Sequence, residues 1–347
     1  MHMADALVSP VVGGTMWLAT AGLAAYSAKK VTKSLDENKV PLMGVLGAFI
    51  FSAQMINFTI PGTGSSGHLG GAMILAILLG PHAAFLTIAS VLTIQALFFA
   101  DGGLLALGCN IFNLGFFPCF IAYPLIYRPL VGTRPNQKRL FLGATMAAII
   151  GLQLGAFGVV LETISSGISD LPFRAFVLLM QPIHLAIGIV EGLVTTAVIC
   201  FVWKECPGII QKAAMSEPLG NVKIKPVLVG LLFTAVLTGG ALSWFASSEP
   251  DGLEWSLAQA TGMEELQEPE AAIYSILANF QRKVAFFPEY NFKESEEKAV
   301  NEPKVTAQDS RPSINSGTTA AGLVGAMMTL LLAGIIGKGL QLVVKRH

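Results

Sequence analysis

The stretch 175-AFVLLMQPIHLAIGIVEGLVTTAVICFVW-203 decides the fold class, because Glu191 is its one acid and it contains no lysine or arginine. A helix needs about 20 mainly apolar residues to cross a bilayer, and this stretch is longer than that. Eight further segments have the same character, of which the third along the chain is short and is either a half-length helix or one arm of a bent pair. These segments are 8–28, 41–58, 70–80, 83–100, 104–127, 140–161, 226–246 and 318–340. We therefore expect an all-α polytopic membrane protein with nine spans.

The composition supports the same conclusion. Of the 347 residues, 53% are hydrophobic and 13% are Asp, Glu, Lys or Arg, and the mean hydropathy is +0.64. Soluble domains carry about 25% charged residues. The chain therefore has too little charge for the surface of a soluble enzyme and too many apolar residues for a disordered protein. Its formal net charge is zero, and without a basic excess we expect no nucleic acid partner.

The apolar segments fall into two units. The first seven fill residues 1–203, a polar cytoplasmic linker follows at 204–225, and the last two segments lie within 226–347. Between those last two segments lies a hydrophilic stretch, 247–317. We therefore expect a seven-span bundle followed by a two-span unit with one long external loop.

Lysine and arginine predict the orientation of the chain, because they concentrate in cytoplasmic loops. Most of them lie in 29–40, 128–139, 204–225 and the C-terminal end from Lys338, and the predicted spans place all four on one side. We therefore expect the N-terminus outside and the C-terminus in the cytoplasm. The external stretch 247–317 carries more acids than bases, which would attract cations.

The first two residues, Met1 and His2, have a specific chelate chemistry. The terminal amine and the backbone nitrogen of His2 close a five-membered ring on a metal, and that backbone nitrogen and the imidazole Nδ1 close a six-membered ring. The three nitrogens share a plane, and planar nitrogen sites suit Ni(II) or Cu(II). The opening MHMADALVSP lacks the basic start of a secretory signal, so we expect Met1 to be retained. The alternative is that His2 is an ordinary residue in a frayed end.

The loop 61-PGTGSSGHLGG-71 offers a fourth nitrogen through His68. Its glycines allow the backbone to pack closely and to turn the imidazole inward. Gly62 and Gly67 have the spacing of a phosphate-binding loop. However, His68 and Leu69 stand where that motif requires Lys and then Ser or Thr, so we exclude nucleotide binding. The alternative for this loop is a flexible connection between two helices.

Four other polar residues are candidates for supporting roles around such a site. Asp101 could accept a hydrogen bond from a metal-binding imidazole, or it could cap a helix, and we favour the cap. Asn110, Asn113 and Gln54 could also support the site. Hydrogen bonding between helices is the interpretation that we favour for each of these three.

His184 and Glu191 are seven residues apart and therefore share one face of a helix. They could form a proton relay, although a structural polar pair is the interpretation that we favour. Glu191 is also the one acid within the nine predicted segments. This argues against a pathway of acidic ion sites near the middle of the bilayer.

At these residues the sequence resembles the CbiM/NikM family, the substrate-capture (S) components of energy-coupling-factor transporters for cobalt and nickel. The resemblance lies in the opening Met1-His2 and in 53-AQMINF-58, 66-SGHLGG-71, 100-ADGGLLALGCNIFNLG-115 and 184-HLAIGIVEGL-193. Further on, 250-PDGLEWS-256 resembles the signature of the small PDGLE-type accessory subunit of the same systems. The chain therefore resembles an S component fused to an accessory subunit.

The resemblance implies a ligand set and partners. The metal would be held by the Met1 amine, the backbone nitrogen and imidazole of His2, and His68. Nickel or cobalt would be the transported substrate, and no organic cofactor is implied. The implied partners are a transmembrane coupling protein and two cytoplasmic ATPases in the plasma (inner) membrane of a bacterium. The start departs from the common family form at Met3-Ala4-Asp5-Ala6, which leaves the fit of the N-terminal turn open.

The sequence thus predicts a subunit of an ATP-driven importer and not an enzyme, since it contains no ATP-binding motif. A secondary transporter or channel for divalent cations is the alternative, and ion-gradient-driven transport by the isolated chain would favour it. A metalloenzyme would need an open coordination position, which a square filled by nitrogens does not leave. The sequence does not decide whether the transported metal is nickel or cobalt, although four in-plane nitrogens favour Ni(II). Copper fits the donors equally well, and only the resemblance excludes it.

Overall fold

The computed structural model describes residues 2–32, 35–132, 135–169, 171–215, 217–262, 269, 271–293 and 315–344. Helices dominate these residues, and one antiparallel hairpin of β1 (Phe58–Ile60) and β2 (Ser65–Gly67) accompanies them. The helices are η1 (Asp5–Leu7), α1 (Pro10–Val31), α2 (Lys39–Gln54), α3 (Ala72–Leu79), α4 (Pro81–Phe99), α5 (Leu107–Ile111), η2 (Phe112–Tyr127), α6 (Arg128–Val131), α7 (Gln137–Ser166), α8 (Phe173–Glu205), α9 (Pro207–Met215), α10 (Lys225–Gly240), η3 (Leu242–Phe245), α11 (Gly252–Thr261), α12 (Ala272–Val284), η4 (Pro288–Tyr290) and α13 (Ser316–Val344). The predicted all-α polytopic fold class is confirmed.

Each of the nine predicted apolar segments contains a helix, but the helices differ in length. Within the described residues, five are long and apolar enough to cross a bilayer: α4, the continuous run from α5 to α6, α7, α8 and α13. The helices α2 and α10 are apolar but shorter, with 16 residues each, and α3 has eight. The number of nine spans therefore stays a prediction.

Local signals set the ends of these helices. Ser9 caps α1 by accepting a hydrogen bond from the Val12 backbone, with Pro10 in the first turn. Gly80, at φ +80°, ends α3 immediately before Pro81 begins α4. Since a positive φ favours glycine, this Gly-Pro pair joins a short helix to a long one.

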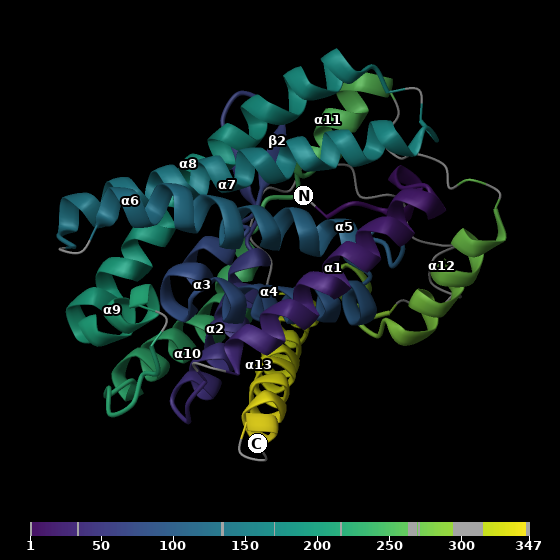
Figure 1. Ribbon diagram of the computed structural model, residues 1–347. Helices are drawn as coiled ribbons and strands as arrows, with labels where there is room; N and C mark the ends of the chain where they lie inside the picture. The colour runs from purple at the N-terminus through teal and green to yellow at the C-terminus, as the bar shows by residue number, and fades with distance from the viewer. Residues whose placement is uncertain are drawn as a thin grey trace.

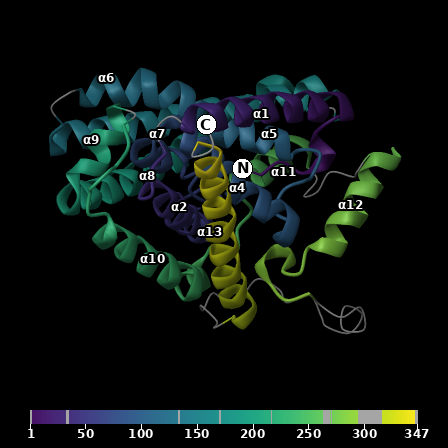
Figure 2. The ribbon, with the colours of Figure 1, turned by 60° about the horizontal axis from the view of Figure 1, so that its bottom comes forward.

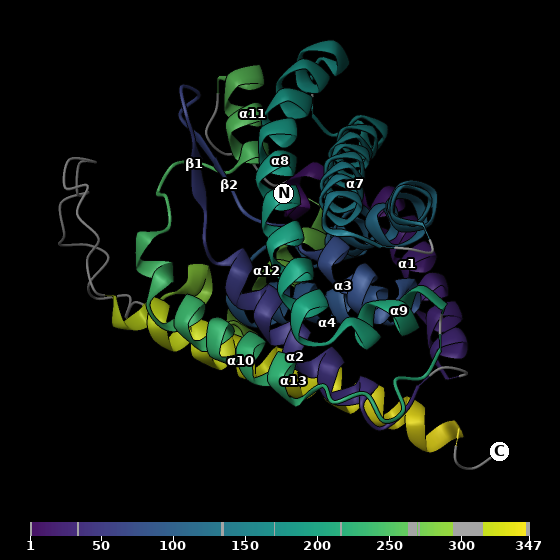
Figure 3. The same ribbon diagram turned by 90° about the vertical axis from the view of Figure 1, so that its left-hand side faces the viewer.

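The two C-terminal apolar helices pack against the first unit. Figure 3 shows α2, α10 and α13 side by side. A Cβ added to Gly322 of α13 would lie 2.2 Å from the carbonyl oxygen of Gly239 in α10, and one added to Gly325 would lie 2.0 Å from a ring carbon of Phe51 in α2. Small residues at helix crossings allow such close approach in membranes, so Gly322 lets α13 approach α10 and Gly325 lets α13 approach α2.

Three features of the structure differ from the sequence-based expectation. The linker 204–225 contains α9, and the hydrophilic stretch 247–317 contains α11 and α12. The helix α7 continues to Ser166 and so includes the buried Glu162. Glu191 is therefore not the one acid within the long apolar helices, because the hydropathy pattern ended the sixth segment too early.

The connecting segments gather at two opposite ends of the bundle. At one end, the Ser247 amide donates to the Asn57 carbonyl at 2.7 Å, and Figures 1 and 2 both show α12 beside the first turns of α1. At the other end, the Gly220 amide donates to Asp36 Oδ2 at 2.5 Å. The lysine-bearing segments 29–40 and 204–225 thus meet at the end away from the hairpin.

Candidate metal site

The start of the chain is buried and held by backbone hydrogen bonds. Met3 is fully buried; its amide donates to Asn110 Oδ1 at 2.8 Å, and its carbonyl accepts from Asn110 Nδ2 at 3.2 Å and from the Gly103 amide at 2.9 Å. The Asp5 carboxylate accepts from the Ala106 amide at 2.9 Å. Asn110 therefore bonds to the N-terminal segment and not to a neighbouring helix, which corrects the interpretation that we favoured.

The two glycines after Asp101 make room for this segment. A Cβ added to Gly103 would lie 1.9 Å from Asp5 Oδ1. A Cβ on Gly102 would lie 2.8 Å from Asn110 Nδ2, and Gly102 also has a φ of +82°. Both positions therefore require glycine.

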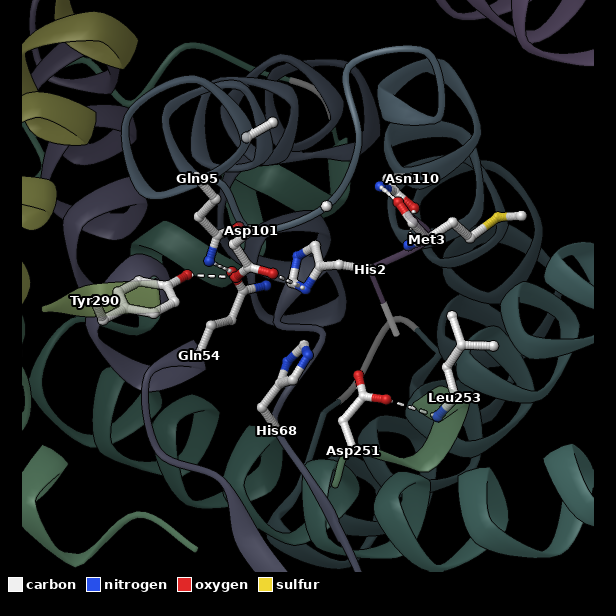
Figure 4. Close-up of polar contacts among 12 residues, drawn as sticks. His2, Met3, Gln54, His68, Gln95, Asp101, Asn110, Asp251, Leu253 and Tyr290 are labelled. Atoms are coloured by element: carbon white, nitrogen blue, oxygen red, sulfur yellow. Dashed lines mark hydrogen bonds and ion pairs between the residues drawn. The ribbon is translucent and has the colours of Figure 1, made fainter. Parts of the chain in front are cut away.

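The imidazoles of His2 and His68 lie next to one another, as Figure 4 shows. Their ring centroids are 5.0 Å apart and their planes differ by 17°. The structure thus brings together the two histidines that the sequence singled out, whereas Met1 lies outside the described residues.

Hydrogen bonds indicate which nitrogen of each ring carries the proton. His68 Nδ1 lies 3.0 Å from the Leu69 carbonyl oxygen, which can only accept, so Nε2 of His68 holds the lone pair. His2 Nδ1 lies 3.2 Å from Asp101 Oδ1. A chelate through this Nδ1 therefore requires its proton to move to Nε2, which leaves the ring neutral.

Asp101 does not cap a helix, which corrects the interpretation that we favoured. The helix α5 that follows begins after Ala106, while the second carboxylate oxygen of Asp101 accepts a hydrogen bond from the Tyr290 hydroxyl. Asp101 therefore links the imidazole of His2 to Tyr290, a residue of η4 that is distant in the sequence. No periodic pattern in the sequence indicated Tyr290.

Burial keeps both imidazoles in the form that binds metals. It lowers the pKa of His2, an effect that the Asp101 carboxylate partly offsets. Burial, together with the neighbouring His2, lowers the pKa of His68 to about 3. Both rings are therefore neutral near pH 7, and neutral imidazole is the form that coordinates a metal.

The loop after His68 is held from two helices. Glu191 of α8 accepts hydrogen bonds from the amides of Gly70 and Gly71 at 2.9 and 3.0 Å. Gln54 of α2 donates to the Gly70 carbonyl at 2.8 Å and accepts from Gln95 at 2.9 Å. Glu191 and Gln54 therefore bond to the loop that carries His68, residues 61–71, which we call the histidine loop. The predicted pair of Glu191 with His184 does not form.

Two further candidates lie apart from this hydrogen-bond network. His184 Nδ1 bonds to the Met180 carbonyl at 2.8 Å within α8. Asn113 donates to Glu162 of α7 at 2.6 Å, which matches the interhelical bond that we favoured for Asn113. The structure thus gives Asn113 no contact with either imidazole.

Comparisons with known proteins agree with this arrangement. The model of the CbiM family, described as the cobalt uptake substrate-specific transmembrane region, matches residues 2–209. The PDGLE domain model matches residues 225–342. The chain belongs to the CbiM family.

The relatives of this CbiM protein include fused proteins of the same two-part build. A putative fused nickel transport protein NikMN of Archaeoglobus fulgidus is 32% identical over 76% of this chain and 84% of its own length. A probable fused nickel transport protein LarMN of Lactiplantibacillus plantarum is 31% identical over 74% of this chain and 78% of its own length. A crystal structure of a truncated transition metal transporter, 32% identical, covers 59% of this chain and 99% of its own, with a TM-score of 0.53.

The PDGLE domain reaches over the histidines of the CbiM domain. A cavity of 970 Å³ is lined by His2, His68 and Asp101 together with Asp251 and Tyr290 of the PDGLE domain. Gln281 of that domain donates hydrogen bonds to the carbonyls of Ala96 and Gly102, both at 2.8 Å. The sequence placed the stretch 247–317 outside the membrane but did not indicate that it covers the histidines.

We expect Glu191→Gln in this CbiM protein to weaken Ni(II) binding about 10-fold, as is usual when a group that orients a ligand is lost. Glutamine replaces one of the two carboxylate oxygens by an NH2 group, so one of the two glycine amides would face a donor in place of its present acceptor. Competition with a chromophoric chelator measures the affinity. Glu162→Gln is the matched control, because Glu162 bonds to Asn113 and not to the loop. Equal Ni(II) affinity in wild type and Glu191→Gln would contradict the role of Glu191.

Proposed function

We propose that this protein is the metal-capturing membrane subunit of an ATP-driven energy-coupling-factor importer for Ni(II), with Co(II) as the second candidate. The metal would be bound by the Met1 amine, the backbone nitrogen and imidazole of His2, and the imidazole of His68. The observation that carries this proposal is the pair of neutral imidazoles, one near the chain start and one just after the hairpin, whose ring centroids are 5.0 Å apart.

The donor set supports nickel. Two imidazoles and two backbone nitrogens form a planar set of the kind that suits Ni(II). Within the described residues no group of three His, Cys, Asp or Glu side chains could hold a metal ion. The names of the fused relatives also refer to nickel transport.

Orientation and partners complete the proposal. We place the N-terminus outside and the C-terminus in the cytoplasm of a bacterial plasma membrane, because lysine-bearing segments meet at the end away from the histidines. Residues 1–203 capture the metal, 204–225 link the units, and 226–347 form the accessory unit. Since the chain has no ATP-binding motif, energy comes from a transmembrane coupling protein and two cytoplasmic ATPases.

Purified protein with an untagged N-terminus should bind one Ni(II) and release about two protons, one from the amine and one from the backbone amide. The imidazoles contribute none at pH 7, because burial already keeps them neutral. Affinity should therefore fall as the pH falls, since protons compete for the amine and the amide. Calorimetric titration at one pH in buffers of different ionisation enthalpy counts the protons, and competition among Ni(II), Co(II) and Cu(II) ranks the metals.

The proton count separates this site from a simpler one. A site built from imidazoles alone would release close to no protons at pH 7. Binding without proton release would therefore exclude the amine and amide as ligands, and no binding of Ni(II) or Co(II) would exclude the proposed function.

A further inference from the structure

The PDGLE segment docks on β2, the strand that ends immediately before His68. The Ser66 amide of β2 donates to the Pro250 carbonyl at 2.8 Å. The Ser66 hydroxyl donates to the Glu249 carbonyl at 2.7 Å, and Ser66 and Asp251 form a parallel bridge. Because main-chain bonds of this kind add a segment to a strand edge, residues 249–251 and the histidine loop hold one another in register.

The carboxylate of Asp251 is held by the start of α11. Its Oδ1 accepts hydrogen bonds from the amides of Leu253 and Glu254 at 2.8 and 2.9 Å. Glu254 Oε2 accepts from the Asp251 amide at 3.0 Å, which completes a capping box. The position of this carboxylate is therefore set by the backbone and not by side-chain flexibility.

Gly252 fixes the distance between this segment and α8. A Cβ added there would lie 2.6 Å from a methyl carbon of Ile183 and 3.2 Å from Cε1 of His184. With no room for a side chain, the backbone at Gly252 packs directly on α8. Asp251 is thereby placed at the wall of the cavity that His2 and His68 line.

Asp251 lines the same space as the histidines. A small cavity of 10 Å³ is lined by His68, His184 and Asp251, and the larger cavity is lined by His2, His68 and Asp251. Figure 4 shows the Asp251 carboxylate on the side of the segment that faces His68. Nε2 of His184 is buried and has no hydrogen-bond partner among the described residues.

We propose that Asp251 is a charged component of the metal site, whose carboxylate stabilises the captured dication without ligating it. This inference rests on the proposed function, because it places the cation at His2 and His68. Each domain then contributes one carboxylate to the site: Asp101 belongs to the CbiM domain and Asp251 to the PDGLE domain. The accessory domain thus takes part in capture itself as well as covering the site.

The test is Asp251→Asn in the full chain with an untagged N-terminus. Asparagine caps helices as well as aspartate does, so the fold is kept while the charge is removed. We expect Ni(II) affinity to fall about 10-fold, with an unchanged melting temperature. Glu217→Gln is the matched control, because it removes the same charge from an exposed residue that does not line the cavity and should change the affinity by less than about 2-fold, as exposed charges are screened.

Asp251→Ser is measured alongside, since serine also caps helices. Wild-type affinity in a folded Asn or Ser variant would show that Asp251 is only a helix cap and would overturn the inference. An equal loss in Glu217→Gln would assign the effect to overall surface charge and would also overturn the inference. Failure of the wild type to bind Ni(II) or Co(II) would instead refute the proposed function, so the two failures are distinguishable.

Discussion

Inserting two glutamines between Met1 and His2 is expected to weaken Ni(II) binding by more than about 100-fold. This exceeds the loss that usually follows removal of a group that only orients a ligand. With two residues inserted, the amine and the imidazole no longer share one backbone nitrogen, so the fused five- and six-membered rings cannot form. The segment cannot slide to compensate, because Met3 is bonded to Asn110 and Gly103. Competition with a chromophoric chelator measures the loss.

The length and type of the insertion matter. A single inserted residue would place histidine third, where an amine, two amides and an imidazole already complete a planar set. Glutamine is bulky enough for the initiator methionine to be retained. A single inserted alanine is the control, because the initiator is removed before alanine and histidine then returns to position two. We expect wild-type binding in that control once mass spectrometry confirms the new start, and tight binding in the two-glutamine variant would exclude the terminal chelate.

His68→Ala should produce a loss of similar size, more than about 100-fold, because it removes the fourth nitrogen of the square. The protein should still insert and melt as the wild type does, since the Gly70 and Gly71 amides keep their bonds to Glu191. Added free imidazole should restore part of the affinity by filling the vacated coordination position. The Ni(II) absorption spectrum and the chelator competition report both effects.

The control for this variant is His82→Ala. His82 is only half-buried and its Nδ1 lies 3.4 Å from the hydroxyl of Ser27, where α4 begins after the Gly80-Pro81 turn. Its removal should leave Ni(II) affinity unchanged. Wild-type affinity in His68→Ala, or an equal loss in His82→Ala, would refute the assignment of His68 as a ligand.

Hydropathy alone predicted where the apolar helices lie, because burial in a bilayer requires long apolar runs. Hydropathy did not predict the helices α9, α11 and α12, which lie in stretches that we treated as connections. The start of α11 could nevertheless have been predicted from the sequence, since Asp251 and Glu254 have the spacing of a capping box.

The pairing of His2 with His68 could be predicted because the chelate chemistry of the first two residues leaves one nitrogen to be found. The residues that form hydrogen bonds around these histidines could not be predicted. Tyr290 bonds to Asp101 across 189 positions, and its backbone adopts a φ of +58°, which nothing in a non-glycine sequence signals. Asn110 was likewise ambiguous, since a polar residue on a buried helix can face a loop as readily as another helix.

The hydroxyl of Tyr274 donates to the carbonyl of Val8 at 3.0 Å across 266 positions. A residue just before α1 is thus bonded to α12 of the PDGLE domain, which is synthesised much later. We expect the N-terminal segment to gain this hydrogen bond only after α12 has been synthesised, so that the start of α1 is held less firmly while the PDGLE domain is still missing.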